Sequence, residues 1–169
     1  MSELYWQQGV EAVSLDQSPP VFESSEPFDT NRIRAAAVYC SDGRFGEQFD
    51  ELLHSHLRLP RYDRLAVPGG AACLARHFAT FREEEGVIEQ LRFLINVHEI
   101  ERVVLIAHEG CAFYGERLKV SPLQLETQQR EDLRKAVRQV RVLSKSVLVE
   151  AYFARVSFEG RVQFQEAEL

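Results

Sequence analysis

The sequence predicts an α/β domain with a mostly parallel sheet, flanking helices and a C-terminal antiparallel hairpin at one edge of the sheet. Two largely apolar runs, IRAAAVY at 33–39 and RVVLIA at 102–107, are typical of buried parallel strands, because strands covered on both faces lose the alternation of polar residues. Segments with the apolar spacing of helices lie between and after these runs. Strands that alternate with helices in this way indicate a parallel sheet.

The first segment of the chain, residues 1–30, is polar and contains several prolines. Ser18-Pro19-Pro20 and the stretch from Ser24 to Pro27 interrupt regular structure. We expect residues 1–30 to form an N-terminal arm or a short helix outside the core. The remaining residues, 31–169, are expected to form a single α/β domain, because a chain of 169 residues is close to the usual size of one domain.

The first half of this domain contains two predicted strands with a helix between them. The strand at 33–39 leads into a helix from Phe45 to Leu57, in which the apolar residues recur at helical spacing. A weaker strand at 62–67 follows. It ends at Pro68-Gly69-Gly70, because proline and glycine do not continue a regular strand.

The second half contains two further helices and a hairpin. Apolar residues at helical spacing predict one helix around Val87–Ile95 and another around Leu133–Val140. The chain closes with the segments 147–158 and 161–165, which are separated by Glu159-Gly160. This pattern predicts an antiparallel hairpin added to an edge of the sheet.

Composition and charge argue against several classes of function. Hydrophobic residues make up 45% of the chain and charged residues 27%, and no apolar run approaches the roughly 20 residues of a membrane-spanning helix. The net charge of −6 and the absence of a Lys/Arg cluster argue against a nucleic-acid partner. The opening, Met1 to Val13, lacks the basic and then apolar pattern of a secretory signal. We therefore expect a cytoplasmic protein with no nucleic-acid or membrane partner.

Cys40 and His108 each follow one of the two buried strands directly. Functional groups in open α/β sheets gather at the carboxyl ends of strands, so both side chains are expected at one crevice. Cys111 follows His108 after two residues, and one tight turn can direct both side chains at a single ion. Thiolate and imidazole suit zinc, and three protein ligands leave the fourth tetrahedral position open. The alternative is that the cysteines are packing residues.

Asp42 and Arg44 lie just after Cys40, in the sequence Cys-Ser-Asp-Gly-Arg. Side chains two residues apart in a turn can form a bidentate carboxylate–guanidinium pair. Such a pair holds Asp42 as a hydrogen-bond acceptor for bound water, whereas release from Arg44 lets the carboxylate ligate the metal instead. A structural interpretation is that Asp42 caps the following helix and forms a surface ion pair with Arg44.

The order Cys40-x-Asp42-x-Arg44, followed much later by His108-x-x-Cys111, resembles the zinc and active-site signature of the β-class carbonic anhydrases. The resemblance implies that Cys40, His108 and Cys111 bind Zn²⁺. It implies that Asp42 and Arg44 are the catalytic polar dyad. It further implies the β-carbonic anhydrase fold, a homodimer or higher homo-oligomer, and the reversible hydration of carbon dioxide to bicarbonate.

The resemblance extends over most of the chain, from about Ile33 to the C-terminal hairpin, and includes the Gly69-Gly70 loop after the second strand. It departs from the family pattern at several positions. Members usually carry an arginine in the motif before the Gly-Gly loop, where this chain has Ala66, and glycines beside the His-x-x-Cys element, where it has Ala107 and Ala112. Loss of a glycine beside the metal constrains how closely backbone and substrate approach.

Three functions are compatible with this motif. The first is that of a zinc-dependent lyase, carbonic anhydrase, in which zinc lowers the pKa of bound water to about 7 and Asp42 accepts a hydrogen bond from that water. The second keeps the zinc and changes the substrate to carbonyl sulfide or carbon disulfide. The third is a zinc-stabilised binding or structural dimer, in which Asp42 occupies the fourth position and no turnover occurs.

The remaining cysteine and histidines are expected outside the site. Cys73 lies in GGAACLARHF and is interpreted as a core-packing residue. His54 and His56 are two residues apart in a predicted helix and therefore point to different faces. His77 and His98 are interpreted as structural or exposed residues near helix ends.

Two further features lie close to the motif. The segment Pro68 to Ala72 lacks the full glycine spacing of dinucleotide or P-loop fingerprints, so no nucleotide cofactor is expected. Phe113 and Tyr114 follow Cys111 directly. They either line the mouth of the site or pack at a subunit interface.

Overall fold

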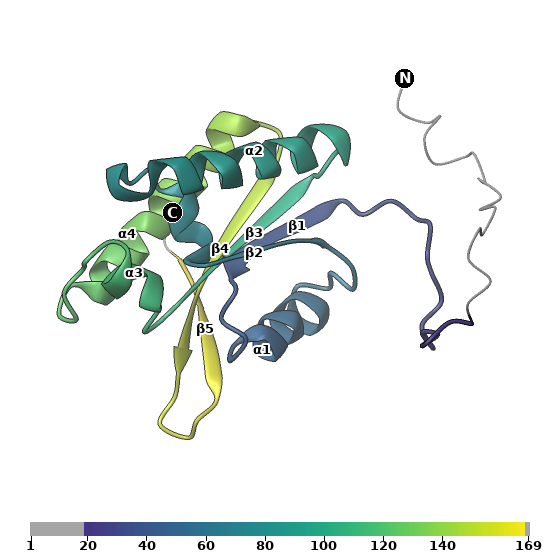
Figure 1. Ribbon diagram of the computed structural model, residues 1–169, viewed down its shortest axis with the longest axis horizontal. Coiled ribbons are helices and arrows are strands. Elements are labelled where there is room, and N and C mark those ends of the chain that lie inside the picture. Colours follow the sequence, from purple (N-terminus) through teal and green to yellow (C-terminus); the bar gives the residue numbers. More distant parts are fainter. Residues whose placement is uncertain (1–18, 168–169) are drawn as a thin grey trace. The chain divides into compact units, whose positions relative to one another are not determined.

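The computed structural model describes residues 19–167 of the 169-residue chain. The chain divides into two compact units, Met1–Arg32 and Ile33–Leu169. In the first unit, the described residues 19–32 contain no helix or strand. The arm or short helix expected for residues 1–30 lies partly at 1–18, outside the described residues (Figure 1).

The second unit is built around a five-stranded sheet in the order β2-β1-β3-β4-β5 (Figure 1). The strands are β1 Ala35–Cys40, β2 Asp63–Val67, β3 Arg102–His108, β4 Leu148–Val156 and β5 Val162–Glu166. Strand β1 pairs in parallel with β2 and β3, β3 pairs in parallel with β4, and β4 pairs antiparallel with β5. The predicted mostly parallel sheet with an antiparallel hairpin at its edge is therefore confirmed.

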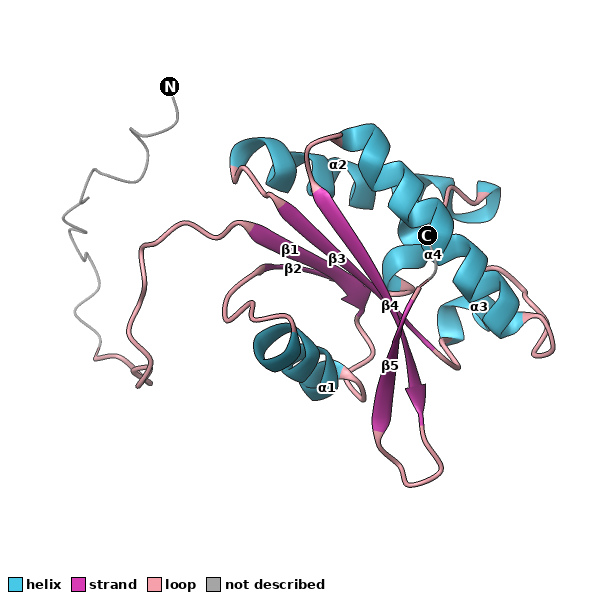
Figure 2. Cartoon of the chain, turned by 180° about the vertical axis from the view of Figure 1, so that it is seen from behind, coloured by secondary structure: helices cyan, strands magenta, loops and turns pink. Residues whose placement is uncertain are grey.

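Helices flank both faces of this sheet. Figure 2 shows α1 (Gly46–Glu51) on one face, and α2 (Phe81–Val97), α3 (Ala112–Glu116) and α4 (Leu125–Leu143) on the other. Helices on both faces are what the apolar runs of β1 and β3 require, since neither face of these strands meets water. The flanking helices of the predicted α/β fold are confirmed.

The helix expected from Phe45 to Leu57 is divided in two. Its first part, α1, is α-helical, and the chain continues as a π-helical turn at Leu52–His56. Phe49, Leu52 and Leu53 are buried, as the apolar spacing predicts. The wider turn was not predicted, because apolar spacing reports which face is buried and not which backbone groups are hydrogen-bonded.

The core consists of two layers, one on each face of the sheet. Val38 and Leu105 belong to the layer packed against α2 and α4, and Tyr39 and Ile106 belong to the layer packed against α1. Neighbouring residues of one strand thus enter opposite layers, as the alternation of side chains along a strand dictates. Every residue of β1 is buried. This packing fixes the position of the strand and of the residue at its carboxyl end.

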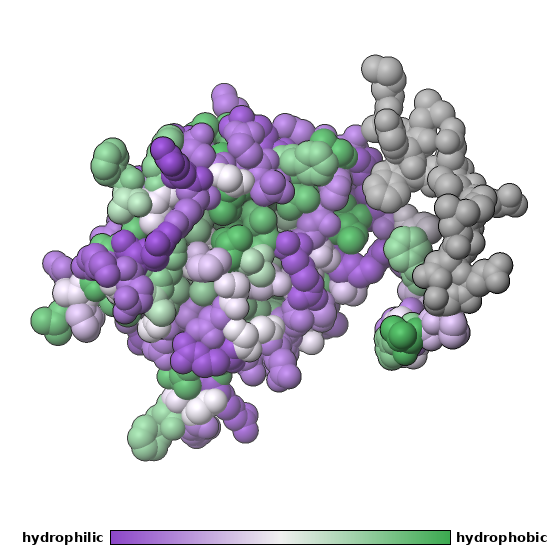
Figure 3. All heavy atoms as spheres, viewed as in Figure 1, coloured by the Kyte–Doolittle hydropathy of each residue, from purple (hydrophilic) through white to green (hydrophobic). Residues whose placement is uncertain are grey.

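The surface of the molecule is mixed in polarity. Hydrophilic side chains cover most of the face seen in Figure 3, and hydrophobic side chains gather near its middle. Large apolar side chains that are exposed include Phe78 and Leu123. Among the described residues, no helix combines the length and the apolar character that crossing a bilayer requires.

Candidate metal centre

Cys40 and His108 lie at the same edge of the sheet. Cys40 is the last residue of β1, and His108 is the last residue of β3. The two strands are parallel neighbours, with Tyr39 paired to Ile106, so their carboxyl ends meet. The sequence predicts that both residues lie just after their strands. In the structure each is the last residue of its strand, and Cys40 still pairs with Val67 of β2. The strand ends thus bring together two side chains that are far apart in sequence.

Cys111 returns to the same place through a tight turn after β3. The Glu109 N–H donates a hydrogen bond to the Ala154 carbonyl oxygen (2.9 Å), which fixes the start of the turn against β4. Gly110 has φ = 63°, a left-handed conformation that residues with a side chain rarely adopt. The turn places Cys111 at the N-cap of α3. The two-residue spacing therefore brings Cys111 back beside His108, as predicted.

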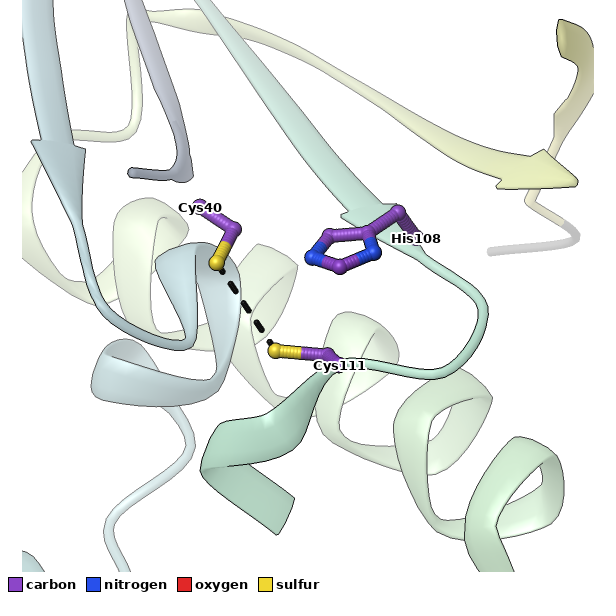
Figure 4. A group of neighbouring side chains, drawn as sticks. All are labelled: Cys40, His108 and Cys111. Carbon is purple, nitrogen blue, oxygen red and sulfur yellow. Dashed lines mark hydrogen bonds between the residues drawn. The ribbon is translucent and has the colours of Figure 1, made fainter. Parts of the chain in front are cut away.

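The three side chains converge on one point (Figure 4). One ligand atom from each of Cys40, His108 and Cys111 lies within 4.8 Å of the other two. The Sγ atoms of Cys40 and Cys111 are 3.7 Å apart, and both thiols are free. All three residues are at most 8% exposed. Figure 4 shows the imidazole extending from the end of β3 toward the two sulfur atoms.

The hydrogen bonds of His108 leave one ring nitrogen without a partner. Its Nδ1 lies 2.8 Å from the carbonyl oxygen of Glu109, so Nδ1 carries the proton and donates it. Its Nε2 is buried and has no hydrogen-bond partner. The Phe45 ring packs against the imidazole with 4.4 Å between centroids, and Gln129 Nε2 donates to the His108 carbonyl oxygen (2.7 Å). These contacts fix the tautomer whose free lone pair is on Nε2.

The two sulfur atoms share a hydrogen bond, and this couples their ionisation. The bond from Cys111 lowers the pKa of the Cys40 thiol to about 4, and the His108 side chain and the backbone N–H groups of Gly69 and Asp42 act in the same direction. The pKa of Cys111 is raised because its proton is held by Cys40 and because the group is buried. The pair therefore carries one negative charge readily, and a second only when a cation compensates it.

The geometry of these donors fits a tetrahedral zinc ion. Thiolates bound to zinc at about 2.3 Å in a tetrahedral arrangement lie about 3.8 Å apart. The observed separation of the Cys40 and Cys111 sulfurs is 3.7 Å. A buried imidazole nitrogen with an unused lone pair supplies the third donor. Sulfur and nitrogen donors suit zinc, whereas magnesium and calcium prefer oxygen donors. The group within 4.8 Å contains no carboxylate.

Asp42 is held by Arg44 next to this centre. The Arg44 guanidinium donates from Nε to Asp42 Oδ1 (2.9 Å) and from Nη2 to Oδ2 (2.5 Å), and its backbone N–H donates to Oδ1 (3.1 Å). These bonds lower the pKa of Asp42 to about 2. The helix-capping alternative is not observed, because the N-cap of α1 is Phe45 and no side chain caps it. The bidentate Asp42–Arg44 pair is present as predicted.

The Gly69-Gly70 loop packs against the backbone of β1. Gly70 has φ = 53°, and a Cβ atom placed on it would lie 2.5 Å from the backbone nitrogen of Cys40. Only glycine fits such a contact without displacing the strand end. The sequence shows the two glycines, but the close contact of Gly70 with the Cys40 backbone is visible only in the structure.

A cavity of about 690 Å³ lies beside Cys40 and Cys111. Cys40, Asp42 and Cys111 are part of its wall, and much of the remainder is apolar, including Val87 and Phe113. His108 is not among the lining residues. The imidazole therefore does not form part of the cavity wall.

The other candidate residues lie outside the ligand group. Cys73 is 3% exposed, contacts the Pro68 carbonyl oxygen (3.2 Å) through its thiol and lines the cavity. His77 Nε2 lies 2.8 Å from Asp132 and His98 Nδ1 lies 2.7 Å from Asp63. The exposed histidines are His54 and His56. Tyr114 is buried, whereas Phe113 lines the cavity.

The three residues that depart from the family pattern, Ala66, Ala107 and Ala112, lie in different environments. Ala66 is exposed on β2 and does not line the cavity. Ala107 is buried in β3 immediately before His108. Ala112 is exposed and does line the cavity. Of the three substitutions, only the one at Ala112 therefore changes the cavity wall itself.

Comparison with known proteins agrees with the fold and the motif. A sequence model of the family described as "Putative carbonic anhydrase" matches residues 30–163. No curated protein sequence is significantly similar to the chain. The β-carbonic anhydrase isoform I of Trichomonas vaginalis superposes with a TM-score of 0.52 at 14% identity, covering 86% of this chain and 90% of that one.

Two further solved structures are similar over most of the chain. A carbonic anhydrase from Streptococcus mutans has a TM-score of 0.49 at 18% identity and covers 81% of this chain and 82% of that one. An apo form of a carbon disulfide hydrolase has a TM-score of 0.47 at 14% identity, covering 79% and 78%. At such identities a structural likeness describes the fold alone, and the Trichomonas structure supports that of the β-carbonic anhydrases.

Proposed function

This chain belongs to the family described as putative carbonic anhydrases, and we propose that it catalyses the reversible hydration of carbon dioxide to bicarbonate. We further propose that Cys40, His108 and Cys111 hold a Zn²⁺ ion, and that Asp42 and Arg44 are the catalytic dyad. The substrate is a small molecule that enters the cavity beside the two sulfur atoms.

The unpartnered Nε2 of His108 is the observation that carries this proposal. A buried polar atom without a hydrogen bond costs about 1–3 kcal/mol, so folded proteins rarely leave one. Here the ring is held with its free lone pair on the side of the Cys40 and Cys111 sulfurs. A cation bound by all three groups would satisfy the nitrogen and stabilise both thiolates.

Zinc, when bound, supplies a Lewis acid that lowers the pKa of a water ligand to about 7. The protein's own groups orient the proposed ligands and fix their protonation. Glu109 keeps the proton of His108 on Nδ1 through its carbonyl oxygen. Such an outer hydrogen bond both orients an imidazole ligand and increases its basicity.

We assign Asp42 as the hydrogen-bond acceptor that orients the nucleophile in the cavity. Its carboxylate lines the cavity, and its pKa of about 2 keeps it ionised throughout the neutral range. It can therefore accept, but not donate, a hydrogen bond at its Oδ atoms and so orient a nucleophile. Arg44 keeps the carboxylate in place with the two ends of its guanidinium fork. Release from Arg44 is the event that would let Asp42 turn toward the metal.

The wall of the cavity suits a neutral, apolar substrate. Val67, Val87 and Phe113 contribute apolar surface beside Cys40 and Cys111. Carbon dioxide carries no charge and no hydrogen-bond donor, so apolar surface excludes competing water without excluding the substrate. The same reasoning admits carbonyl sulfide and carbon disulfide, and these two compounds are the controls for substrate identity.

Metal analysis combined with stopped-flow hydration of carbon dioxide tests the proposal. We expect about one zinc per chain, loss of zinc in Cys111→Ser, and full zinc content in Cys73→Ser, a matched variant of a buried cysteine outside the ligand group. Asp42→Ala should retain zinc and lose turnover. Unchanged carbon dioxide hydration in Asp42→Ala would defeat the assignment of the dyad.

The two alternative functions give different results in the same assays. A hydrolase of carbonyl sulfide or carbon disulfide would release sulfide from these compounds and leave carbon dioxide unchanged. A structural zinc site would bind one zinc, show no turnover with any of the three compounds, and lose its assembly when zinc is removed. Either result would replace the carbonic anhydrase assignment.

Assembly into a homodimer or higher homo-oligomer is part of the proposal, as is a cytoplasmic location. Phe78 and Leu123 are 99% and 97% exposed, and large exposed apolar side chains are common at contacts between subunits. Light scattering coupled to size-exclusion chromatography measures the assembly. A monomer at micromolar concentration would contradict this part of the proposal.

A further inference from the structure

The cavity beside the two sulfur atoms has a charged rim as well as an apolar wall. Three acidic residues, Asp42, Glu83 and Glu116, are among its lining residues, together with Arg117. Among the described lining residues, Arg117 is the only one with a cationic side chain. The product of the proposed reaction, bicarbonate, is an anion, so the location of this single cation bears on how the product is held.

Arg117 is joined to the candidate metal centre by one short helix. Cys111 is the N-cap of α3, and Arg117 follows its last residue, with its N–H bonded to the Phe113 carbonyl oxygen (2.8 Å). The backbone position of Arg117 is therefore fixed relative to a candidate ligand.

The guanidinium of Arg117 is paired with Glu83, which lies in the first turn of α2. The pair bridges two helices at the edge of the cavity. The two side chains are 56% and 45% exposed, so water screens their attraction and a competing anion can exchange with the carboxylate. Arg44 is not a candidate for this role, because its guanidinium is bonded to both oxygens of Asp42 and it does not line the cavity.

We propose that Arg117 is the oxyanion-binding side chain of this cavity and that Glu83 competes with the bound anion for it. The inference rests on the proposed function and names the charged ligand of that site as a small carboxylate-like oxyanion, bicarbonate. A guanidinium presents a planar fork of N–H donors that matches two oxygens of such an anion. Neutral carbon dioxide has no comparable interaction with Arg117.

This assignment separates the two directions of the reaction. Removal of the guanidinium weakens binding of the anionic substrate, so the KM for bicarbonate in dehydration should rise up to about fivefold in Arg117→Gln. The KM for carbon dioxide in hydration should change much less. Removal of the competing carboxylate in Glu83→Gln should lower the KM for bicarbonate.

The direct test measures binding of acetate, a carboxylate that cannot be hydrated or dehydrated, by isothermal titration calorimetry on the purified protein. Arg117→Gln should weaken acetate binding up to about fivefold, and Glu83→Gln should tighten it. The matched controls are Arg82→Gln and Glu85→Gln, which change the same charges on α2 at positions that do not line the cavity. Both controls should bind acetate as the unmodified protein does.

The outcomes keep this inference distinct from the proposed function. Equal acetate affinities for Arg117→Gln and Arg82→Gln would overturn the assignment, whether or not the protein hydrates carbon dioxide. A protein without hydration activity that still loses acetate binding in Arg117→Gln, and not in Arg82→Gln, would keep the anion site and remove the carbonic anhydrase assignment. Tighter binding in Glu85→Gln equal to that in Glu83→Gln would overturn the competition by Glu83.

Discussion

The Sγ atoms of Cys40 and Cys111 lie 3.7 Å apart, although the two residues are 71 positions apart in sequence and belong to different elements. This separation is too long for a disulfide bond of about 2.05 Å, and it matches two thiolates on one tetrahedral metal ion. The Nε2 atom of His108 beside them is buried without a hydrogen-bond partner, and the pKa of Cys111 is raised by the bond to Cys40 and by burial. The folded chain therefore has an arrangement that metal binding stabilises.

Zinc should raise the thermal stability of the protein. At a free zinc concentration about 100 times the dissociation constant, binding adds about 2.7 kcal/mol, which corresponds to a rise in Tm of about 5–10 °C. Differential scanning calorimetry with and without a chelator measures the shift. Cys40→Ser should melt at the same temperature in both conditions, and a zinc-dependent shift that persists in this variant would place the metal elsewhere.

Gly70→Ala should destabilise the protein and weaken zinc binding together. The added Cβ would meet the Cys40 backbone at 2.5 Å, and φ at this position is 53°. We expect a loss of about 2 kcal/mol or more in the free energy of unfolding. The matched variant is Gly86→Ala in α2, where a Cβ meets nothing within 4 Å. Chemical denaturation should show Gly86→Ala to be about 0.5–1 kcal/mol more stable than the parent. Equal stability of the two variants would contradict the close approach at Gly70.

Arg44→Gln should raise the pKa of Asp42 from about 2 toward its ordinary value of 3.8. A carboxylate whose pKa is lowered by folding stabilises the folded state above its unfolded pKa, and this contribution is lost as the pH falls through the folded pKa. The contribution of Asp42 is therefore present above pH 3.8 and lost toward pH 2. Carboxyl ¹³C NMR titration measures the pKa directly. Arg34→Gln, which removes an exposed ion pair with Glu101, is the control and should leave Asp42 unchanged.

Gln129→Leu should weaken zinc binding without touching a ligand atom. The buried Gln129 amide donates to the carbonyl oxygen of His108 and so holds the end of β3 in place. Loss of a buried hydrogen bond costs about 1–3 kcal/mol, and loss of an outer contact to a metal ligand costs about tenfold or more in affinity. Competition with a chromophoric chelator measures the affinity. Gln128→Leu on the same helix loses a bond to Asp132 instead, and an equal loss of zinc affinity in both variants would argue against a specific effect at His108.

The sheet was predictable because burial on both faces leaves a clear pattern in the residues. The runs that end at Cys40 and His108 are largely apolar, and the structure buries β1 at every position. The parallel order of the strands then placed both residues at one edge of the sheet. The position of Cys111 beside His108 was also predictable, because a turn of two residues can adopt only a few conformations.

Contacts between distant segments were not predictable. Nothing in the sequence around Gln129 indicates that its amide reaches His108, and nothing around Arg117 or Glu83 indicates that both line one cavity. Such contacts depend on how the helices pack against the sheet. No local pattern in a single sequence reports that packing. The same limit explains why Asp42 was open to interpretation as a helix cap until the backbone showed α1 beginning beyond Phe45.

Zinc K-edge X-ray absorption on the purified, unmodified protein tests the central claim most directly. We expect a first shell with two sulfur atoms at about 2.3 Å and one imidazole nitrogen at about 2.0–2.1 Å, from Cys40, Cys111 and His108, together with one lighter oxygen donor. A zinc shell with fewer than two sulfur atoms, or a protein that purifies with no zinc and takes up none, would contradict the account.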